Sequence, residues 1–160
     1  MTAKTDFTEA EWTALQKGIT GSGFLVSLSD RDLTDTFTQS RGGGRRQHEA
    51  LDILAPRRTP VRAVEGGKIV KLFNSKLGGL TIYQFDPSER FCYYYAHLDG
   101  YASGVTEGRS VSRGDVIGYV GTTGNAPPET PHLHFAVFLL GPDRHWWEGT
   151  AIDPYPLFRE

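Results

Sequence analysis

The chain lacks the features that define several large classes of protein. Its one cysteine, Cys92, rules out an internal disulfide, and we expect it to be a small buried residue. No apolar run approaches the roughly 20 residues of a membrane-spanning helix, and residues 1–6 lack the apolar core of a signal peptide. A formal net charge of −2 without any basic block argues against nucleic acid as a partner. With 160 residues, 12% of them aromatic, the chain can form one globular domain with a sizeable core.

Four of the five histidines lie in three short segments that also contain an aspartate. These segments are His48–Asp52, Tyr95–Leu98 and His132–His134. Imidazole nitrogen and carboxylate oxygen are ordinary zinc ligands, and three protein ligands with one open position are typical of a catalytic zinc site. The segments therefore predict a metal centre.

The spacing within two of these segments bears on the roles of their residues. His132 and His134 precede an apolar run, 135–140, that reads as a strand. Residues i and i+2 of a strand share a face and lie roughly 6.6 Å apart. This suits a pair in which one histidine binds the metal and the other addresses the attacking water. His48 and Asp52 are four residues apart, which fits either a helix face or a bend.

In their order along the chain, these motifs resemble those of the LytM-type, lysostaphin-like zinc metallopeptidases of family M23. The pattern is His-x-x-x-Asp, then Tyr-Ala-His-Leu, then Gly-Thr-Thr-Gly-Asn before Pro-His-Leu-His-Phe, and it extends from about Asp35 to Phe158. The resemblance implies that His48, Asp52 and His134 bind Zn²⁺ and that His97 and His132 are catalytic. One departure is Ala50, where the family usually has glycine. The segment 146–156 is similar to that of a Gram-negative branch of the family.

The resemblance also implies an activity, a substrate and a location. We expect a zinc-dependent endopeptidase that hydrolyses peptide cross-links of bacterial peptidoglycan with a zinc-activated water. One of the two catalytic histidines would act as the base, and the other would donate a hydrogen bond to the tetrahedral intermediate. The D-Ala–diaminopimelate bond is the preferred substrate and a glycyl-glycine bond the second choice. The expected location is periplasmic or extracellular, although the chain shows no signal peptide. The oligomeric state is left open.

The predicted fold is mainly β, an antiparallel sandwich or barrel-like LytM domain with a short N-terminal helix. Residues 1–32 form an appended segment, in which Phe7–Lys17 has a capping box, and residues 33–160 form the peptidase domain. Short β-rich runs bounded by turn residues predict strands at 61–64, 68–73, 80–85, 91–96 and 133–140, the last of which would close the sheet. The turn cluster Asp86–Arg90 would join the 80–85 and 91–96 strands as a hairpin. His97 would follow a strand end, the glycines at 42–44 would lie in a loop beside the cleft, and four tyrosines could line the groove: Tyr83, Tyr93, Tyr95 and Tyr119.

Three other functions compete with the endopeptidase. A catalytically inactive zinc-binding domain that binds peptidoglycan or activates another enzyme is the main alternative, but such relatives usually lose ligands. A lipoyl- or biotin-type carrier shares the Gly-Asp-Val-Ile-Gly turn pattern at 114–118, but none of the five lysines has the required setting. An intracellular metallopeptidase acting on another peptide is the third.

Overall fold

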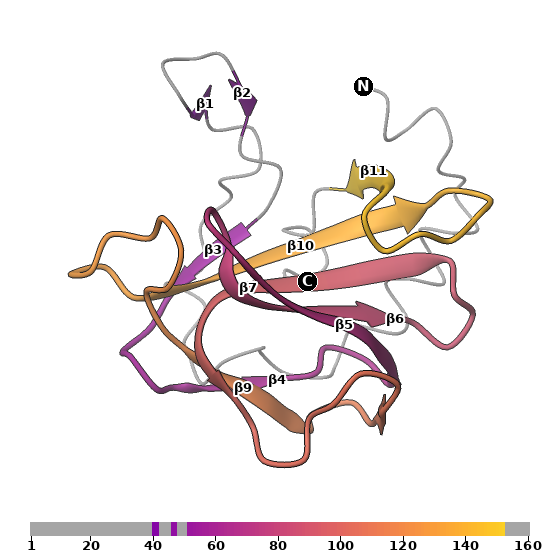
Figure 1. The fold of residues 1–160 in the computed structure, drawn as a ribbon, viewed down its shortest axis with the longest axis horizontal. Coiled ribbons are helices and arrows are strands. Elements are labelled where there is room, and N and C mark those ends of the chain that lie inside the picture. Colours follow the sequence, from indigo (N-terminus) through magenta and orange to yellow (C-terminus); the bar gives the residue numbers. More distant parts are fainter. Residues whose placement is uncertain (1–39, 42–45, 48–50, 153–160) are drawn as a thin grey trace, which may run out of the picture.

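The computed structural model describes residues 40–41, 46–47 and 51–152, all of them in strands, turns and connecting segments (Figure 1). The predicted helix Phe7–Lys17 and the whole of segment 1–32 lie outside these residues, so the domain boundary stays a prediction. No helix of the described part is long and apolar enough to cross a membrane. The strands are β1 (Ser40–Arg41), β2 (Arg46–Gln47), β3 (Leu51–Leu54), β4 (Pro60–Arg62), β5 (Gly67–Ser75), β6 (Gly79–Phe85), β7 (Phe91–Tyr101), β8 (Ser110–Val111), β9 (Val116–Val120), β10 (His132–Leu140) and β11 (Gly149–Ile152).

The mainly antiparallel β fold is confirmed, and β10 lies at its centre. One long side of β10 pairs with β7, while the other side pairs first with β3 and then with β11. From β7 the sheet continues through β6 and β5 to β8. The short strands β1 and β2 pair with each other on either side of residues 42–45.

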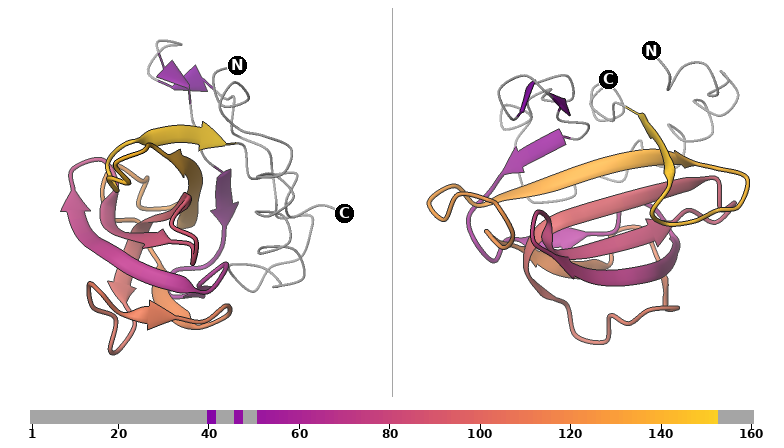
Figure 2. Two further views of the ribbon diagram at one scale, coloured as in Figure 1. Left: turned by 90° about the vertical axis from the view of Figure 1, so that its right-hand side faces the viewer. Right: turned by 45° about the horizontal axis from the view of Figure 1, so that its top comes forward.

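Strand alternation assigns one face of this sheet to the core. In β10, Leu133, Phe135 and Val137 are fully buried and pack with Tyr93 and Tyr95 of β7. The intervening residues of both strands lie on the opposite face, because successive side chains of a strand alternate. The β4–β9 pair forms a second layer against the buried face, as Figures 1 and 2 show, and the core lies between the layers.

Most predicted strands are confirmed, with corrections at their ends. The Asp86–Arg90 turn joins β6 to β7 as predicted, and the Asp86 carboxylate accepts hydrogen bonds from the Ser88, Arg90 and Phe91 amides. The prediction that the 133–140 strand closes the sheet is wrong, because β11 pairs beyond it. β7 also runs to Tyr101, past the predicted end at Ala96, with consequences for His97 described below.

Cys92 is fully buried, in agreement with the prediction of a structural thiol. Burial raises the pKa of its thiol to about 12, so the reactive thiolate is not populated at neutral pH.

A buried polar network connects the core strands to the segment after β4. The Tyr95 hydroxyl donates to Gln84 Oε1 at 2.7 Å and accepts from the Val64 amide at 3.1 Å. Gln84 Nε2 donates to the Glu65 carbonyl at 2.6 Å, and the Tyr93 hydroxyl donates to the Glu65 carboxylate. Desolvation is the main cause of the raised pKa of Glu65, against which this hydrogen bond acts. Such a network stabilises a core because each buried polar group has a partner.

Removing one hydroxyl from this network should destabilise the fold. Tyr95→Phe leaves both the Gln84 carbonyl oxygen and the Val64 amide without their buried partner, so we expect a loss of about 1–3 kcal/mol in the free energy of unfolding. Urea denaturation measures the loss. Tyr119→Phe, at a partly exposed tyrosine whose ring lies under Arg58, is the matched control. Equal stabilities of the two variants would contradict the role of the network.

Candidate active site

Three of the predicted site residues lie side by side on the solvent-facing side of the sheet. Asp52 of β3 is the register partner of His134 of β10, and His132 is the partner of Leu54. The prediction that His132 and His134 share a face of a strand is confirmed. Asp52 lies on a strand, so the helix-face interpretation is wrong at this residue.

Asp52 and His134 have the geometry of two ligands of one metal ion. His134 Nδ1 lies 3.1 Å from Asp52 Oδ1. Two ligand atoms of a tetrahedral zinc, each about 2.0–2.2 Å from the metal, lie about 3.3 Å apart. His132 Nε2 is 3.7 Å from the same carboxylate oxygen, so it faces the same point. The donor set and its spacing fit zinc.

The predicted third ligand, His48, lies outside the described residues, as does Ala50. Within the described part of the chain, no three His, Cys, Asp or Glu side chains are grouped so that they could hold a metal. The ligand role of His48 therefore stays a prediction. His145, the fifth histidine, lies away from the site in the turn before β11, where its side chain is hydrogen-bonded to Glu148.

His97 reaches the site because β7 has a bulge. Leu80 pairs with Leu98 while Ile82 pairs with Tyr95, so three steps along β7 match two along β6. His97 has a φ of 61°, an uncommon conformation for a non-glycine residue, and its amide donates to the Gly78 carbonyl at 2.7 Å. Regular alternation would turn His97 toward the core with Tyr95, but the bulge gives that place to Leu98. The prediction that His97 follows a strand end is wrong, since it is a bulge residue inside β7.

The segment 122–131 holds both histidines in the same way. His97 Nδ1 lies 2.7 Å from the Thr123 carbonyl oxygen, and His132 Nδ1 lies 3.0 Å from the Thr130 carbonyl oxygen. A carbonyl can only accept, so each Nδ1 carries the proton and donates it. In the neutral ring, Nε2 then has the lone pair. The ring centroids of His97 and His132 lie 5.0 Å apart, and the ring centroids of His97 and His134 lie 5.5 Å apart.

The protonation state of His97 agrees with this arrangement. His97 is only 5% exposed, and this burial is the largest effect on its imidazole. It lowers the pKa to about 4, although the hydrogen bond to Thr123 acts in the opposite direction. His97 is therefore a neutral proton acceptor at neutral pH in the metal-free protein.

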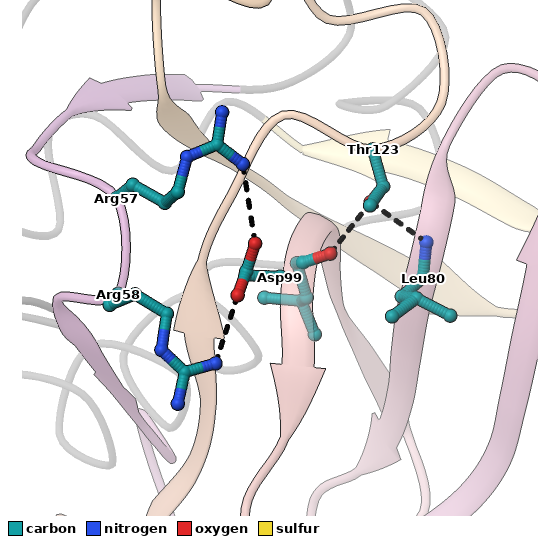
Figure 3. Close-up of polar contacts among 6 residues, drawn as sticks. Arg57, Arg58, Leu80, Asp99 and Thr123 are labelled. Atoms are coloured by element: carbon teal, nitrogen blue, oxygen red, sulfur yellow. Dashed lines mark hydrogen bonds and ion pairs between the residues drawn. The ribbon is translucent and has the colours of Figure 1, made fainter.

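Thr123 fixes this segment to two strands at once. Its hydroxyl donates to the Leu98 carbonyl at 2.7 Å and accepts from the Leu80 amide at 3.1 Å, so it lies between β6 and β7 (Figure 3). Gly79 and Gly124 allow the close approach: both have positive φ, and a Cβ at either would collide with backbone of the other segment. The carbonyl that orients His97 is thus held by the side chain of the same residue.

An ion-pair cluster ties the residues after β3 to the strand that holds His97. Arg57 and Arg58 lie on either side of Asp99 in Figure 3, with Nη1–Oδ distances of 3.3 and 2.9 Å. The Arg58 hydrogen bond is the main cause that holds the pKa of Asp99 below its usual range. Such exposed pairs are worth about 0–1 kcal/mol, so the cluster adds orientation more than stability.

The four tyrosines that were predicted to line the groove lie in different places in the structure. Tyr93 and Tyr95 are fully buried in the core, so they do not line it. Tyr119 packs under Arg58 near the Asp99 cluster. Tyr83 lies on the face that carries the site, beside Tyr94, whose ring edge contacts His134 at 5.9 Å. No role at the site was predicted for Tyr94, Thr123 or Thr130. The Gly-Thr-Thr-Gly motif before His132 was the sequence signal that could have pointed to the segment holding the histidines.

A sheet that brings a His/Asp donor pair and two further histidines to one face supplies the groups that a metal-dependent hydrolase needs. The match of the Peptidase family M23 profile to residues 46–154 narrows this class. The chain belongs to peptidase family M23, as the sequence motifs indicated.

Two curated relatives of this chain are endopeptidases by name. The chain is 36% identical over 141 residues to the L-Ala–D-Glu endopeptidase of Bacillus subtilis, which covers 84% of this chain and 42% of the relative. It is 37% identical over 100 residues to a DD-carboxypeptidase/endopeptidase of Neisseria meningitidis, covering 60% and 21%. The chain thus spans less than half the length of these curated relatives.

The fold agrees with a solved structure from the same family. The catalytic domain of lysostaphin from Staphylococcus simulans superimposes with a TM-score of 0.63 and 32% identity, covering 76% of this chain and 84% of that domain. Because the relatives come from Bacillus, Neisseria and Staphylococcus, the Gram-negative branch stays a prediction.

The Thr123 hydroxyl should control which nitrogen of His97 carries the proton. Thr123→Val keeps the shape of the side chain but removes both hydrogen bonds to β6 and β7, so we expect the Thr123 carbonyl to shift and the Nδ1–H form to mix with the Nε2–H form. The ¹⁵N chemical shifts of the His97 ring measure this ratio. Thr123→Ser, which keeps the hydroxyl, should retain the wild-type ratio. A wild-type ring protonated mainly on Nε2 would contradict the assignment.

Proposed function

We propose that the chain is a zinc-dependent endopeptidase that hydrolyses peptide bonds of bacterial peptidoglycan. The observation that supports this most is the placement of the Asp52–His134 donor pair beside two histidines whose Nδ1 atoms are both held by backbone carbonyls. The names of two relatives, an L-Ala–D-Glu endopeptidase and a DD-carboxypeptidase/endopeptidase, support a peptide substrate that contains D-amino acids, as peptidoglycan does.

His48, Asp52 and His134 would hold the zinc ion. When bound, zinc supplies a Lewis acid that polarises the scissile carbonyl and lowers the pKa of water toward about 7. Asp52 on β3 and His134 on β10 are register partners across the sheet. A carboxylate and an imidazole bind a metal ion in their deprotonated forms. Because the two side chains already lie side by side, the pair is preorganised for a cation.

His97 and His132 would handle the proton and the developing charge. Each has its Nδ1 proton engaged by a carbonyl, which directs Nε2 to the reaction. One Nε2 accepts the proton of the attacking water and passes it to the leaving amine. The other, in its protonated form, donates a hydrogen bond to the oxygen of the tetrahedral intermediate. The two rings lie close enough, at 5.0 Å between centroids, to serve one substrate carbonyl.

The bond cleaved is proposed to be the D-Ala–diaminopimelate cross-link, which the DD-endopeptidase name of the Neisseria relative supports. A second candidate is the L-Ala–D-Glu bond, because the Bacillus relative with that specificity matches 84% of this chain. Either substrate places the activity outside the cytoplasm, where peptidoglycan lies. The inactive zinc-binding alternative is less favoured, because this chain keeps His48, Asp52, His134, His97 and His132.

Digestion of purified cross-linked muropeptides tests the activity and the bond together. We expect the full chain to convert dimers into smaller products, a chelator to stop the reaction, and added Zn²⁺ to restore it. The product masses distinguish the two candidate bonds. His145→Ala, which changes a histidine that is neither a proposed ligand nor a proposed catalytic residue, should still cleave the dimers. Intact dimers after incubation with the zinc-loaded protein would overturn the proposal and favour a binding role.

The proposed roles of the histidines separate metal binding from catalysis. Asp52→Asn and His134→Ala should weaken Zn²⁺ binding by more than about 100-fold, because even outer partners of metal ligands contribute about 10–100-fold. His97→Ala and His132→Ala should bind Zn²⁺ with little change but cleave about 10²–10⁴-fold more slowly. Calorimetric titration of the metal-free protein and the digestion assay measure the two effects. Loss of zinc in the second pair would reassign those residues as ligands.

A further inference from the structure

A row of aromatic side chains extends from the site across the same face of the sheet. Tyr94 lies on β7, Tyr83 on β6 and Phe73 on β5, while Trp146 and Trp147 belong to the turn between β10 and β11. We call these five residues the aromatic shelf. The proposed hydrolysis assigns no role to any of these five residues.

The shelf is continuous with the metal-binding pair. The Tyr94 ring faces His134 edge-on with 5.9 Å between ring centroids. The centroid of the Tyr83 ring lies 4.8 Å from that of Tyr94 and 4.6 Å from that of Trp146. Trp147 packs edge-on against Trp146 at 5.3 Å. An extended chain advances about 3.4 Å per residue, so Trp146 lies within roughly four to five extended residues of His134.

The far end of the shelf is exposed. Trp147 is 61% and Phe73 43% exposed, which places them among the most exposed large apolar side chains of the described residues. The two contribute little to the core, since the buried cluster is on the other face of the sheet. Exposed aromatic groups gathered beside a site usually serve recognition.

Polar groups of both signs flank the shelf. The Lys71 ammonium lies 5.7 Å from the Trp146 ring and pairs with Glu107 at 3.6 Å. The His145 ring stacks on Trp147 at 4.3 Å, and its Nδ1 is 3.0 Å from Glu148. A lipid chain or an apolar helix would remove these charged pairs from water without offering them any hydrogen bond in exchange, and a polyanion would be repelled by Glu107 and Glu148. The shelf therefore fits a ligand that has an apolar face and a rim of hydrogen-bond donors and acceptors.

We propose that the aromatic shelf binds an N-acetylated hexosamine ring of the glycan strand that carries the substrate peptide, a proposal that rests on the proposed function. The C–H face of a pyranose ring stacks on aromatic faces, and its hydroxyl and acetamido groups match Lys71, Glu107, His145 and Glu148. Because the stem peptide is attached to such a sugar, a ring held near Trp146 and Trp147 would place a bond a few residues away at His134.

Binding is tested without any cleavage, using N,N′,N″,N‴-tetraacetylchitotetraose as the probe and the full chain. We expect the indole N–H signals of Trp146 and Trp147 to shift on titration. Trp147→Ala should weaken binding about five- to tenfold, as loss of one aromatic stacking partner does, and Trp147→Phe should retain most of it. Because Trp147 is exposed, its replacement leaves the core intact, which a urea titration verifies.

Cleavage separates the shelf from the catalytic site. A muropeptide dimer that keeps its sugars should be cleaved with a higher kcat/KM than the same dimer after an amidase has removed them. Trp147→Ala should lose this preference and cleave the sugar-free dimer at the wild-type rate, while Trp147→Phe should keep the preference. Absence of tetrasaccharide binding together with equal cleavage of both dimers would overturn the shelf and leave the endopeptidase standing. Failure to cleave either dimer would overturn the endopeptidase, and the titration would still decide whether the shelf binds sugar.

Discussion

The hydrogen bonds of Thr123 are the constraint on which the arrangement of the site depends. One hydroxyl joins β6, β7 and the segment 122–131, and the carbonyl of the same residue holds the His97 ring. The other end of that segment holds His132 through Thr130. Two histidines from distant parts of the sequence therefore take their orientation from one loop, so a displacement of the loop would misalign both. Their rigidity comes from backbone partners, which side-chain motion does not disturb.

The sheet separates stability from chemistry by strand alternation. Leu133, Phe135, Tyr93 and Tyr95 build the core from one face, while the other face of the same strands presents the site. The bulge at His97 is the exception that makes the separation work, since it shifts the alternation of β7 by one residue. Its left-handed backbone is tolerated because the Gly78 carbonyl and the Thr123 carbonyl over-determine the position of the residue.

The candidate active site and the aromatic shelf lie on different parts of the same face of the sheet. The His/Asp pair and the two carbonyl-anchored histidines occupy the β3, β7 and β10 end. The aromatic shelf lies toward β5 and the turn before β11. This separation would let the surface that binds the substrate change without disturbing the residues that carry out the chemistry.

Much of this protein could be predicted from the sequence, because its signals are local. Short β-rich runs bounded by turn residues located β5 and β6, an apolar run located β10, the Asp86–Arg90 cluster located a hairpin, and the ordered motifs identified the family. The sequence also named Asp52, His134, His97 and His132 as candidates. Only the tertiary structure decided that His97 stands in a bulge, that Tyr93 and Tyr95 face the core while Tyr94 faces the site, and that Trp146 reaches Tyr83. The physical reason is that strand phase, close backbone approach and contacts between distant segments depend on register across the sheet, which no local window of sequence contains.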